Sequence, residues 1–277
     1  MMRIMLLFLC CLMAYGQTSQ DWIQLFNGKN LDGWDVKIRG HEWNENYANT
    51  FRVENGVLKV SYDGYQDFGN RFGHLYSKQK FSHYILVVEY RFTGEQAPGG
   101  PAWAIRNSGA MLHSQAAADI GKDQDFPASI EAQFLGGNGT ADRTTLNLCT
   151  PGTHVEMHGK LVTRHCVNST SATYHGEQWV RAELVVLGAR SFEHKIDERT
   201  VLKYEKPQYG GGNVSGLKAP LPAEGTPLGE GHIAMQSESH PVEFRKVELL
   251  NLKGCMDPKA SNFKKWYVEP DNSQCKR

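Results

Sequence analysis

The sequence has almost no stretch with a helical period, and its one long apolar run lies near the start. Nothing later approaches the roughly 20 apolar residues that a membrane-spanning helix needs. The chain has no serine-hydrolase elbow, phosphate-binding glycine loop or dinucleotide fingerprint. Its 30 basic and 30 acidic residues cancel, so the charge indicates no nucleic-acid or anionic-membrane partner.

The first sixteen residues have the pattern of a secretory signal. Arg3 supplies the positive start, residues 6–12 the apolar run, and Ala14-Tyr15-Gly16 a small-x-small cleavage site. We therefore expect an exported protein, periplasmic or extracellular, that begins near Gln17. Lipid anchoring at the two cysteines of this segment is disfavoured because bulky residues precede them.

Four cysteines remain after the signal, an even number that favours two disulfides in an exported chain. Three pairings are open, and proximity favours Cys149 with Cys166 and Cys255 with Cys275. No Cys-x-x-Cys spacing supports a metal site instead. The second pair would close a short tail, residues 254–277, whose composition differs from that of residues 17–253.

Short β-branched and aromatic runs recur between Gly, Asn and Asp residues, which predicts an all-β sandwich of two packed antiparallel sheets. Asn55-Gly56 marks a hairpin between residues 51–53 and 57–60. Further strands are expected at residues 84–92, 102–113, 129–135, 179–187, 191–196, 201–205, 232–237 and 242–252. Residues 136–178 and 206–231 do not fit as strands and are expected to be long, functional loops.

Alternation along residues 130–134 places Glu131 and Gln133 on the face opposite the apolar residues. Asn107 and His113 share one parity of the preceding predicted strand. Arg106 has the other parity unless a bulge intervenes. The sequence therefore predicts a polar cluster on one sheet face, although a solvated face of no function would have the same pattern.

The predicted loop 136–178 carries several histidines. His154 and His158 are four residues apart, but Val155 stands where a zinc-protease helix needs Glu. A proton-carrying role is therefore favoured over metal binding. No cofactor is firmly predicted from the sequence, and a divalent metal stays open.

Several motifs together resemble the 3-keto-disaccharide hydrolase domain family, which is related in fold to concanavalin A-like lectins and glucanases. These motifs are the opening Leu25-Phe26-Asn27-Gly28-Lys29-Asn30-Leu31-Asp32-Gly33-Trp34, then Asn107-Ser108-Gly109, Glu131-Ala132-Gln133, and the closing residues 231–239 and 242–247. The resemblance covers residues 22–252 and implies a two-sheet jelly roll. The Glu-x-Asp-x-x-Glu strand of related glucanases is absent, since Gln133 replaces its Asp.

The resemblance implies chemistry on a 3-keto-glycoside, whose ketone acidifies the proton on carbon 2. A base removes that proton, a donor stabilises the enolate, and an acid assists the group leaving carbon 1. Among candidate residues, Glu131 or His154 is expected as base and His113 or His165 as acid. Substrate contacts are expected from Arg106, Asn107, Gln133, Arg164 and Gln236.

The leading hypothesis is thus an exported enzyme that cleaves 3-keto-glycosides by elimination and hydration or by net hydrolysis. A lectin-like module that binds sugar without catalysis is the alternative, because lectins share this sandwich. A structural domain attached through its tail is a third. The group of His, Glu and Arg residues between positions 106 and 165 favours the enzyme.

Overall fold

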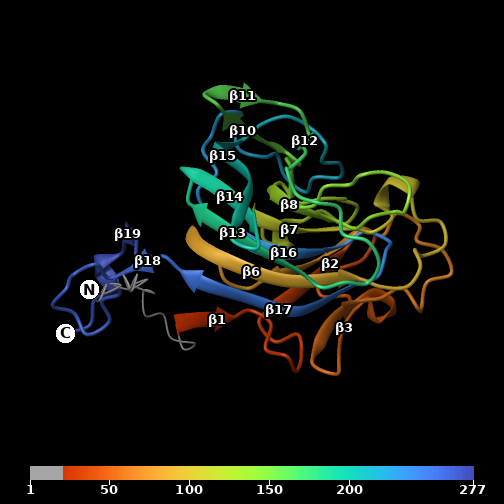
Figure 1. The fold of residues 1–277 in the computed structure, drawn as a ribbon, viewed down its shortest axis with the longest axis horizontal. Coiled ribbons are helices and arrows are strands. Elements are labelled where there is room, and N and C mark those ends of the chain that lie inside the picture. The colour runs from red at the N-terminus through yellow and green to blue at the C-terminus, as the bar shows by residue number, and fades with distance from the viewer. Residues whose placement is uncertain (1–20) are drawn as a thin grey trace, which may run out of the picture.

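The computed structural model describes residues 21–277, so the expected export signal lies outside the described residues. The described chain is a sandwich of two large antiparallel sheets with a few short 3-10 turns (Figure 1). The two-sheet jelly roll predicted from the sequence is confirmed. Among the described residues no helix is long and apolar enough to cross a membrane.

The larger sheet contains ten strands in the order β11-β10-β15-β14-β13-β6-β17-β4-β3, with β1 paired to β17. Its central strands are long and join residues far apart in sequence, since β17 pairs with β6 over almost its whole length. The bounds are β1 Trp22–Gln24, β3 Phe51–Glu54, β4 Val57–Val60, β6 His83–Phe92, β10 Thr153–Met157, β11 Lys160–Val162, β13 Val180–Leu187, β14 Ser191–Ile196, β15 Arg199–Tyr209 and β17 Val242–Asn251.

The second sheet contains seven strands in the order β12-β9-β8-β7-β16-β5-β2. Its strands are β2 Trp34–Ile38, β5 Gly73–Ser77, β7 Asn107–Ser114, β8 Ile130–Leu135, β9 Asn147–Cys149, β12 Cys166–Val167 and β16 His232–Ser237. Three-residue 3-10 turns, Tyr47–Asn49, Ala102–Ala104, Ala117–Asp119 and Asn272–Gln274, interrupt the connections.

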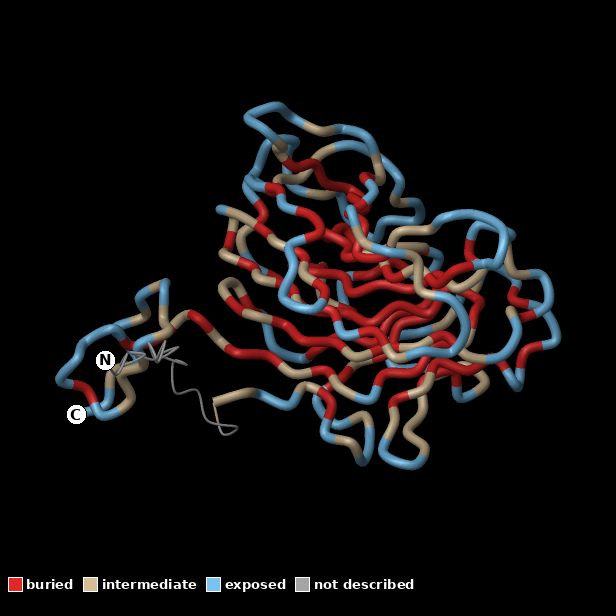
Figure 2. Tube along the Cα trace, viewed as in Figure 1, coloured by how far each residue is buried: buried red, intermediate tan, exposed pale blue. Residues whose placement is uncertain are grey.

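The hydrophobic core lies between the two sheets, where buried segments of both run alongside each other (Figure 2). Alternation assigns one face of each strand to this core. On β8, Ile130, Ala132 and Phe134 are fully buried. The ring of Phe134 stacks on Tyr90 of β6, with centroids 4.3 Å apart and an interplanar angle of 11°. This contact joins the two sheets.

A bulge in β7 changes the direction of His113. Met111 pairs with Ala234 and Ser114 with His232, so three steps on β7 face two on β16. His113 has a positive φ of 49° within this irregularity. Its ring consequently points into the interior, 6.0 Å from the Tyr84 ring, instead of joining the face that carries Glu131.

Three strand predictions need correction. Strand β15 continues to Tyr209, so the loop expected from residue 206 begins later. Residues 136–178 contain β9, β10, β11 and β12, whose short lengths hid them among turn residues. The strand expected from residue 102 begins only at Asn107, because Ala102–Ala104 forms a 3-10 turn and Arg106 has a φ of 46°. The hairpin at residues 51–60 is confirmed, with positive φ at Asn55 and Gly56.

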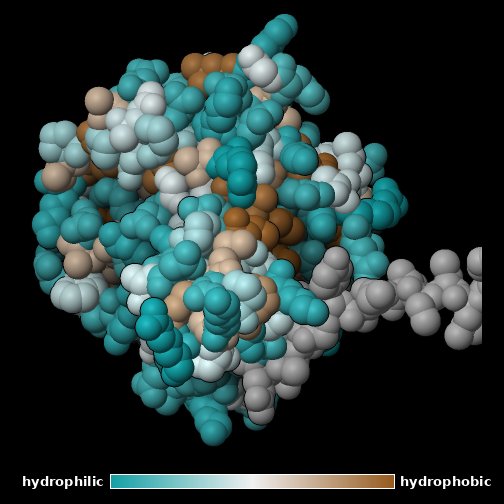
Figure 3. Space-filling model, turned by 90° about the vertical axis from the view of Figure 1, so that its left-hand side faces the viewer, coloured by the Kyte–Doolittle hydropathy of each residue, from teal (hydrophilic) through white to brown (hydrophobic). Residues whose placement is uncertain are grey.

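Both disulfides favoured by proximity are present. Cys149 and Cys166 face each other across the β9–β12 pair, and Cys255 joins Cys275 in the tail. The tail extends from the end of β17 and adds a two-stranded parallel pair, β18 Lys253–Gly254 with β19 Glu269–Pro270. Figure 3, which views this end of the molecule, shows a mainly hydrophilic surface with a small apolar group near its centre.

Phe134→Ala should lower the free energy of unfolding by about 3–5 kcal/mol, because it removes a buried aromatic ring and leaves a cavity between the sheets. Urea denaturation measures this value. Leu161→Ala removes a 49% exposed side chain of an edge strand and serves as the control, with an expected change below about 0.5 kcal/mol. Equal losses in the two variants would contradict the assigned core.

Candidate functional site

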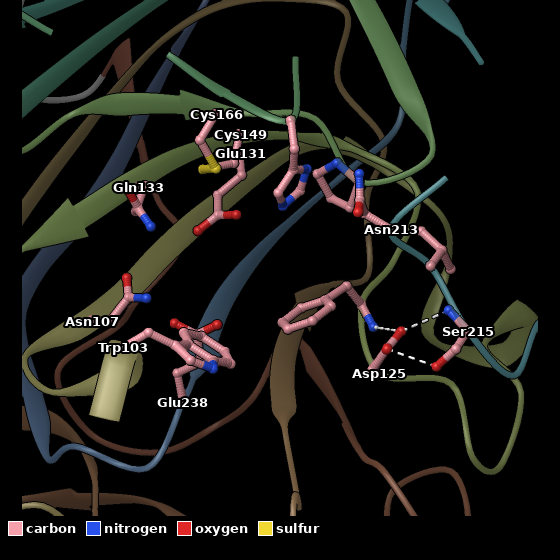
Figure 4. Close-up of a pocket in the computed structure, with 14 residues that line it drawn as sticks. Trp103, Asn107, Asp125, Glu131, Gln133, Cys149, Cys166, Asn213, Ser215 and Glu238 are labelled. Carbon is pink, nitrogen blue, oxygen red and sulfur yellow. Dashed lines mark hydrogen bonds between the residues drawn. A yellow bond between two sulfur atoms is a disulfide. The ribbon is translucent and has the colours of Figure 1, made fainter. Parts of the chain in front are cut away.

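A cavity of about 570 Å³ opens on the outer face of the seven-stranded sheet (Figure 4). Its walls come from β7, β8, β9 and β12, from the residue that follows β16, from the turn Ala102–Ala104 and from four further connections. The lining residues are Trp103, Asn107, Asp125, Phe126, Glu131, Gln133, Cys149, Pro151, His165, Cys166, Asn213, Val214, Ser215 and Glu238.

Strand β8 provides the first carboxyl group. Its core face holds Ile130 and Ala132, so Glu131 points to the other face and into the cavity (Figure 4). Gly109 on β7 leaves room for this side chain, since a Cβ at Gly109 would lie 2.6 Å from Oε1 of Glu131. The Glu131 residue is 6% exposed.

The second carboxyl group belongs to Glu238, directly after β16. Alternation from Ala234 through Gln236 brings it to the cavity face. Glu238 is 3% exposed, and its Oε2 has no hydrogen-bond partner. Figure 4 shows the two carboxyl groups pointing toward each other from opposite sides of the cavity.

The environment of this pair favours the protonated forms. Burial raises the pKa of Glu131 to about 8. Burial, and next the charge of Glu131, raise the pKa of Glu238 well above its ordinary value. In the described chain no basic side chain forms an ion pair with either group. The pair therefore retains protons at neutral pH and releases them one after the other.

The side-chain amides of Gln133 and Asn107 form one side of the cavity beside the carboxyl groups. Nδ2 of Asn147 donates a 3.0 Å hydrogen bond to Oε1 of Gln133. The bond fixes the orientation of the Gln133 amide, whose nitrogen points into the cavity (Figure 4). Asn107, 3% exposed, lies on the same side. The site thus holds a fixed N–H donor close to two buried acids.

His165 and the first disulfide form another wall. Cys149 lies opposite Glu131 in the β8–β9 register, and a disulfide joins Cys149 to Cys166. The neighbouring His165 lines the cavity with its Nδ1 unpartnered. Burial lowers the pKa of His165, so its ring is neutral at neutral pH.

An aromatic wall completes the cavity. Trp103 and Phe126 line it together with Pro151 and Val214. The segment that carries Val214 is held in place by Asp125, which accepts hydrogen bonds from the amide of Ser215 at 2.9 Å and from its hydroxyl at 2.7 Å (Figure 4).

The structure brings together four of the nine residues selected from the sequence: Asn107, Glu131, Gln133 and His165. Gln236 is buried on the same sheet face, in register with His74, with both amide atoms unpartnered. The sequence alone did not select Glu238, Trp103 or Asn147. Glu238 belongs to the same closing motif as Gln236 and has the same strand parity, so alternation could have identified it.

The other four selected residues lie outside the cavity lining. His113 contacts the backbone carbonyls of Leu228 and Ser82 in the interior. His154 belongs to β10 of the ten-stranded sheet, and its Nδ1 lies 3.7 Å from Oε1 of Glu224. Arg106 donates to the carbonyl of Gly176, because its positive φ turns the side chain aside. Arg164 is exposed.

One described group of side chains has the spacing of a metal site: Cys149, His165 and Cys166, whose ligand atoms lie within 4.8 Å of one another. Both sulfur atoms are consumed by the disulfide, so they provide no thiolate. This group is therefore a wall of the cavity in the oxidised protein.

Comparison with known proteins gives one family match. The family model of the 3-keto-alpha-glucoside-1,2-lyase-like domain matches residues 21–250, which is nearly the whole sandwich and excludes the tail. No curated protein sequence is significantly similar to the chain.

Solved structures with a similar arrangement are distant in sequence. A Parabacteroides distasonis protein, provisionally described as a glycosyl hydrolase, is 15% identical with a TM-score of 0.49, over 83% of this chain and 99% of its own. A Bacillus licheniformis beta-glucanase is 13% identical with a TM-score of 0.45, over 83% and 97%. The carbohydrate-binding module CBM66 of Bacillus subtilis is 8% identical with a TM-score of 0.39, over 83% and 96%. The function must therefore be argued from the residues of this chain.

The raised pKa of Glu131 predicts a pH-dependent effect of Glu131→Gln on stability. Unfolded Glu131 loses its proton near pH 4.5, whereas the folded form keeps it to about pH 8. Folding takes up a proton between these values, so the wild type loses stability as pH rises through this range. The variant should be more stable by about 3 kcal/mol at pH 7 and show no such gain at pH 4.

Urea unfolding at a series of pH values with intact disulfides measures the difference. Glu205→Gln, at an exposed position of β15, is the control and should follow the wild-type pH dependence. A Glu131→Gln variant whose stability runs parallel to that of the wild type would show that Glu131 is ionised in the folded protein.

Proposed function

Because the chain belongs to the family of 3-keto-alpha-glucoside-1,2-lyase-like domains, we propose that it cleaves 3-keto-glycosides by base-initiated elimination. Membership supports a carbohydrate-active role. The finer assignment rests on one observation: two buried carboxyl groups, Glu131 and Glu238, face each other across a cavity with an oriented amide donor.

The first step of the proposed reaction is proton abstraction. The ionised member of the carboxyl pair takes the proton from carbon 2, and the electrons of that C–H bond form the enolate of the ketone at carbon 3. A base with a pKa near 8 is well matched to this step at neutral pH. Glu131 is assigned this role because its side chain extends from the rigid sheet.

The second step breaks the bond between carbon 1 and the glycosidic oxygen. The enolate electrons form the double bond between carbons 1 and 2 and regenerate the ketone. Glu238, still protonated because burial and then the neighbouring Glu131 raise its pKa, gives its proton to the leaving oxygen. The products are an unsaturated keto sugar and an alcohol, and addition of water to the former completes a net hydrolysis.

The amide groups stabilise charge on the ketone oxygen. Asn147 holds the Gln133 amide with its N–H group toward the cavity, where it donates to the developing enolate. Such a donor does not have to reorient during the reaction, which is the main source of electrostatic catalysis. Asn107 and the neutral His165 supply further polar contacts to the sugar.

A sugar-binding module is the second candidate, favoured by the aromatic wall of Trp103 and Phe126. Such a module gains nothing from two buried, unpaired carboxyl groups, which cost stability at neutral pH. We therefore place the enzyme first. We also propose that the protein is exported, a location with which its two disulfides are consistent.

Purified protein should release the aglycone from a glucoside with a ketone at carbon 3 and leave the matched glucoside without the ketone intact. The ketone is needed because it alone acidifies the proton on carbon 2. Binding of both compounds without cleavage of either would overturn the enzyme in favour of the sugar-binding module. Cleavage of both would favour a glycosidase that uses the two carboxyl groups directly.

A parallel reaction with a chelator tests the assigned roles. Unchanged release supports the mechanism carried by the carboxyl pair. Loss of release that an added divalent cation restores would overturn it and assign activation of the ketone to a metal.

Glu131→Gln and Glu238→Gln should each lower kcat by about 10²–10⁴-fold, the contribution of a positioned base or acid. Both substitutions preserve side-chain shape, and circular dichroism checks the fold. In the wild type, kcat/KM should rise as pH approaches about 8, where Glu131 loses its proton. Glu156→Gln, on β10 and outside the cavity lining, is the matched control. Near-normal turnover of folded Glu131→Gln would exclude Glu131 as the base.

A further inference from the structure

The disulfide between Cys149 and Cys166 lies in the wall of the cavity. Both cysteines line the cavity together with His165, and Cys166 is partly exposed. A small reductant that enters a cavity of about 570 Å³ therefore reaches the sulfur atoms. Exposed disulfides are the ones that exchange readily with thiols, so this bond is open to reduction from the cavity.

The sheet holds these residues in place without help from the disulfide. Cys149 ends β9, which pairs with β8 over all three of its residues. The amide and the hydroxyl of Thr150 both donate to the carbonyl of His165, at 2.9 Å and 3.1 Å. Beyond the disulfide, Val167 pairs with Leu148. Reduction breaks the bond between the sulfur atoms and none of these contacts, so the two thiols stay close together.

His165 adds a third ligand group beside the two sulfur atoms. Its Nδ1 is buried and has no hydrogen-bond partner. A ring nitrogen of His165 and both sulfur atoms lie within 4.8 Å of one another. Bonds to zinc of about 2.0–2.3 Å place the ligand atoms of a tetrahedral site roughly 3.5 Å apart. Small rotations of the side chains therefore bring the three groups onto one ion.

The fourth position of such a site faces the carboxyl group of Glu131. Cys149 and Glu131 are opposite each other on neighbouring strands, so their side chains project from the same face of the sheet. Figure 4 shows Glu131 beside the two cysteines. A carboxylate oxygen binds zinc alongside sulfur and nitrogen ligands, and Glu131 is therefore placed to complete the coordination.

We propose that reduction of the disulfide converts this wall of the cavity into a binding site for Zn²⁺, held by Cys149, Cys166, His165 and Glu131. A thiol reductant gives two electrons and two protons to the disulfide and is itself oxidised to a disulfide. Binding of the ion then releases the protons of the two new thiols. Thiolate and imidazole ligands favour Zn²⁺ over Mg²⁺ or Ca²⁺.

The disulfide and the zinc site exclude each other, because both use the same two sulfur atoms. The redox state of the protein thus decides whether a cation lies beside Glu131. The proposal concerns binding alone and does not depend on the proposed function.

The second disulfide provides an internal comparison. Cys255 and Cys275 are joined in the tail. In the part of the chain that the structure describes, no group of ligand residues with the spacing of a metal site includes them. Reduction there should produce two thiols without a zinc site.

The test measures zinc binding by the oxidised and the reduced protein. A phosphine reduces the disulfides and becomes the phosphine oxide, its oxygen coming from water. The reduced protein should bind one Zn²⁺ per chain, and Co²⁺ should give the sulfur-to-cobalt charge-transfer bands of a tetrahedral thiolate site. The oxidised protein should bind neither ion. Zinc binding that is the same before and after reduction would overturn the proposal.

Variants identify the ligands in the reduced protein. Cys149→Ser, Cys166→Ser and His165→Ala should each weaken zinc binding about 100-fold or more, because even the loss of an outer-shell partner costs about 10–100-fold. Glu131→Gln should weaken it less and shift the cobalt spectrum. Unchanged affinity in His165→Ala or in either cysteine variant would overturn the site, and an unchanged cobalt spectrum in Glu131→Gln would exclude Glu131 as a ligand.

Two controls should bind zinc as the reduced wild type does. One is the double variant Cys255→Ser with Cys275→Ser. The other is His158→Ala, which removes an exposed histidine outside the cavity lining. Loss of zinc binding in the double variant would assign the ion to the tail and overturn the proposal.

Circular dichroism shows whether the reduced protein stays folded. If it unfolds without a cation, reduction in the presence of Zn²⁺ should preserve the native spectrum, because an ion that binds only the folded chain stabilises it. His165→Ala should lose this protection. Equal unfolding of the reduced wild type with and without Zn²⁺ would overturn the site.

Discussion

The strict alternation of β8 is the constraint on which the site depends. One face of the strand packs Phe134 against Tyr90 of the other sheet, and this contact fixes the position of the backbone. The opposite face then directs Glu131 and Gln133 into the cavity. Chemistry on the outer face is as precise as the packing on the inner one, because both belong to the same six residues.

Burial of the carboxyl groups shows that the sandwich is not optimised for stability at this place. Two acids without a cationic partner are unfavourable when ionised, and each raises the cost of ionising the other. A folded protein tolerates such a pair where its unusual protonation is useful. The large core between the sheets offsets this local cost.

The sequence predicted the two-sheet fold and the longer strands because alternation and turn chemistry are local signals, but it did not assign the short strands β1, β2, β5, β9, β10, β11 and β12. The hairpin at Asn55-Gly56, the strand at residues 232–237 and both disulfides could be assigned from neighbouring residues. Failures came from irregular backbone. The bulge that turns His113 inward depends on the register with β16, and the positive φ of Arg106 precedes a strand that starts later than expected. Glu238 was missed because it lies one residue beyond the predicted strand 232–237, and only residues within the strand were considered for the sheet face.

The hydrogen bond from Asn147 to Gln133 has a consequence for ligand discrimination. A glutamine amide is ordinarily ambivalent, since it rotates to accept or to donate. Once its oxygen accepts the bond from Asn147, the Gln133 amide offers the ligand only its N–H group and acts as a hydrogen-bond donor. A ketone oxygen has lone pairs and no hydrogen, so it can accept a hydrogen bond from this donor. A hydroxyl group at the same point brings a hydrogen that the amide cannot accept, and a buried donor without an acceptor is costly. Under the proposed function, Asn147 on the neighbouring strand β9 would thereby help the pocket distinguish a keto sugar from the parent sugar.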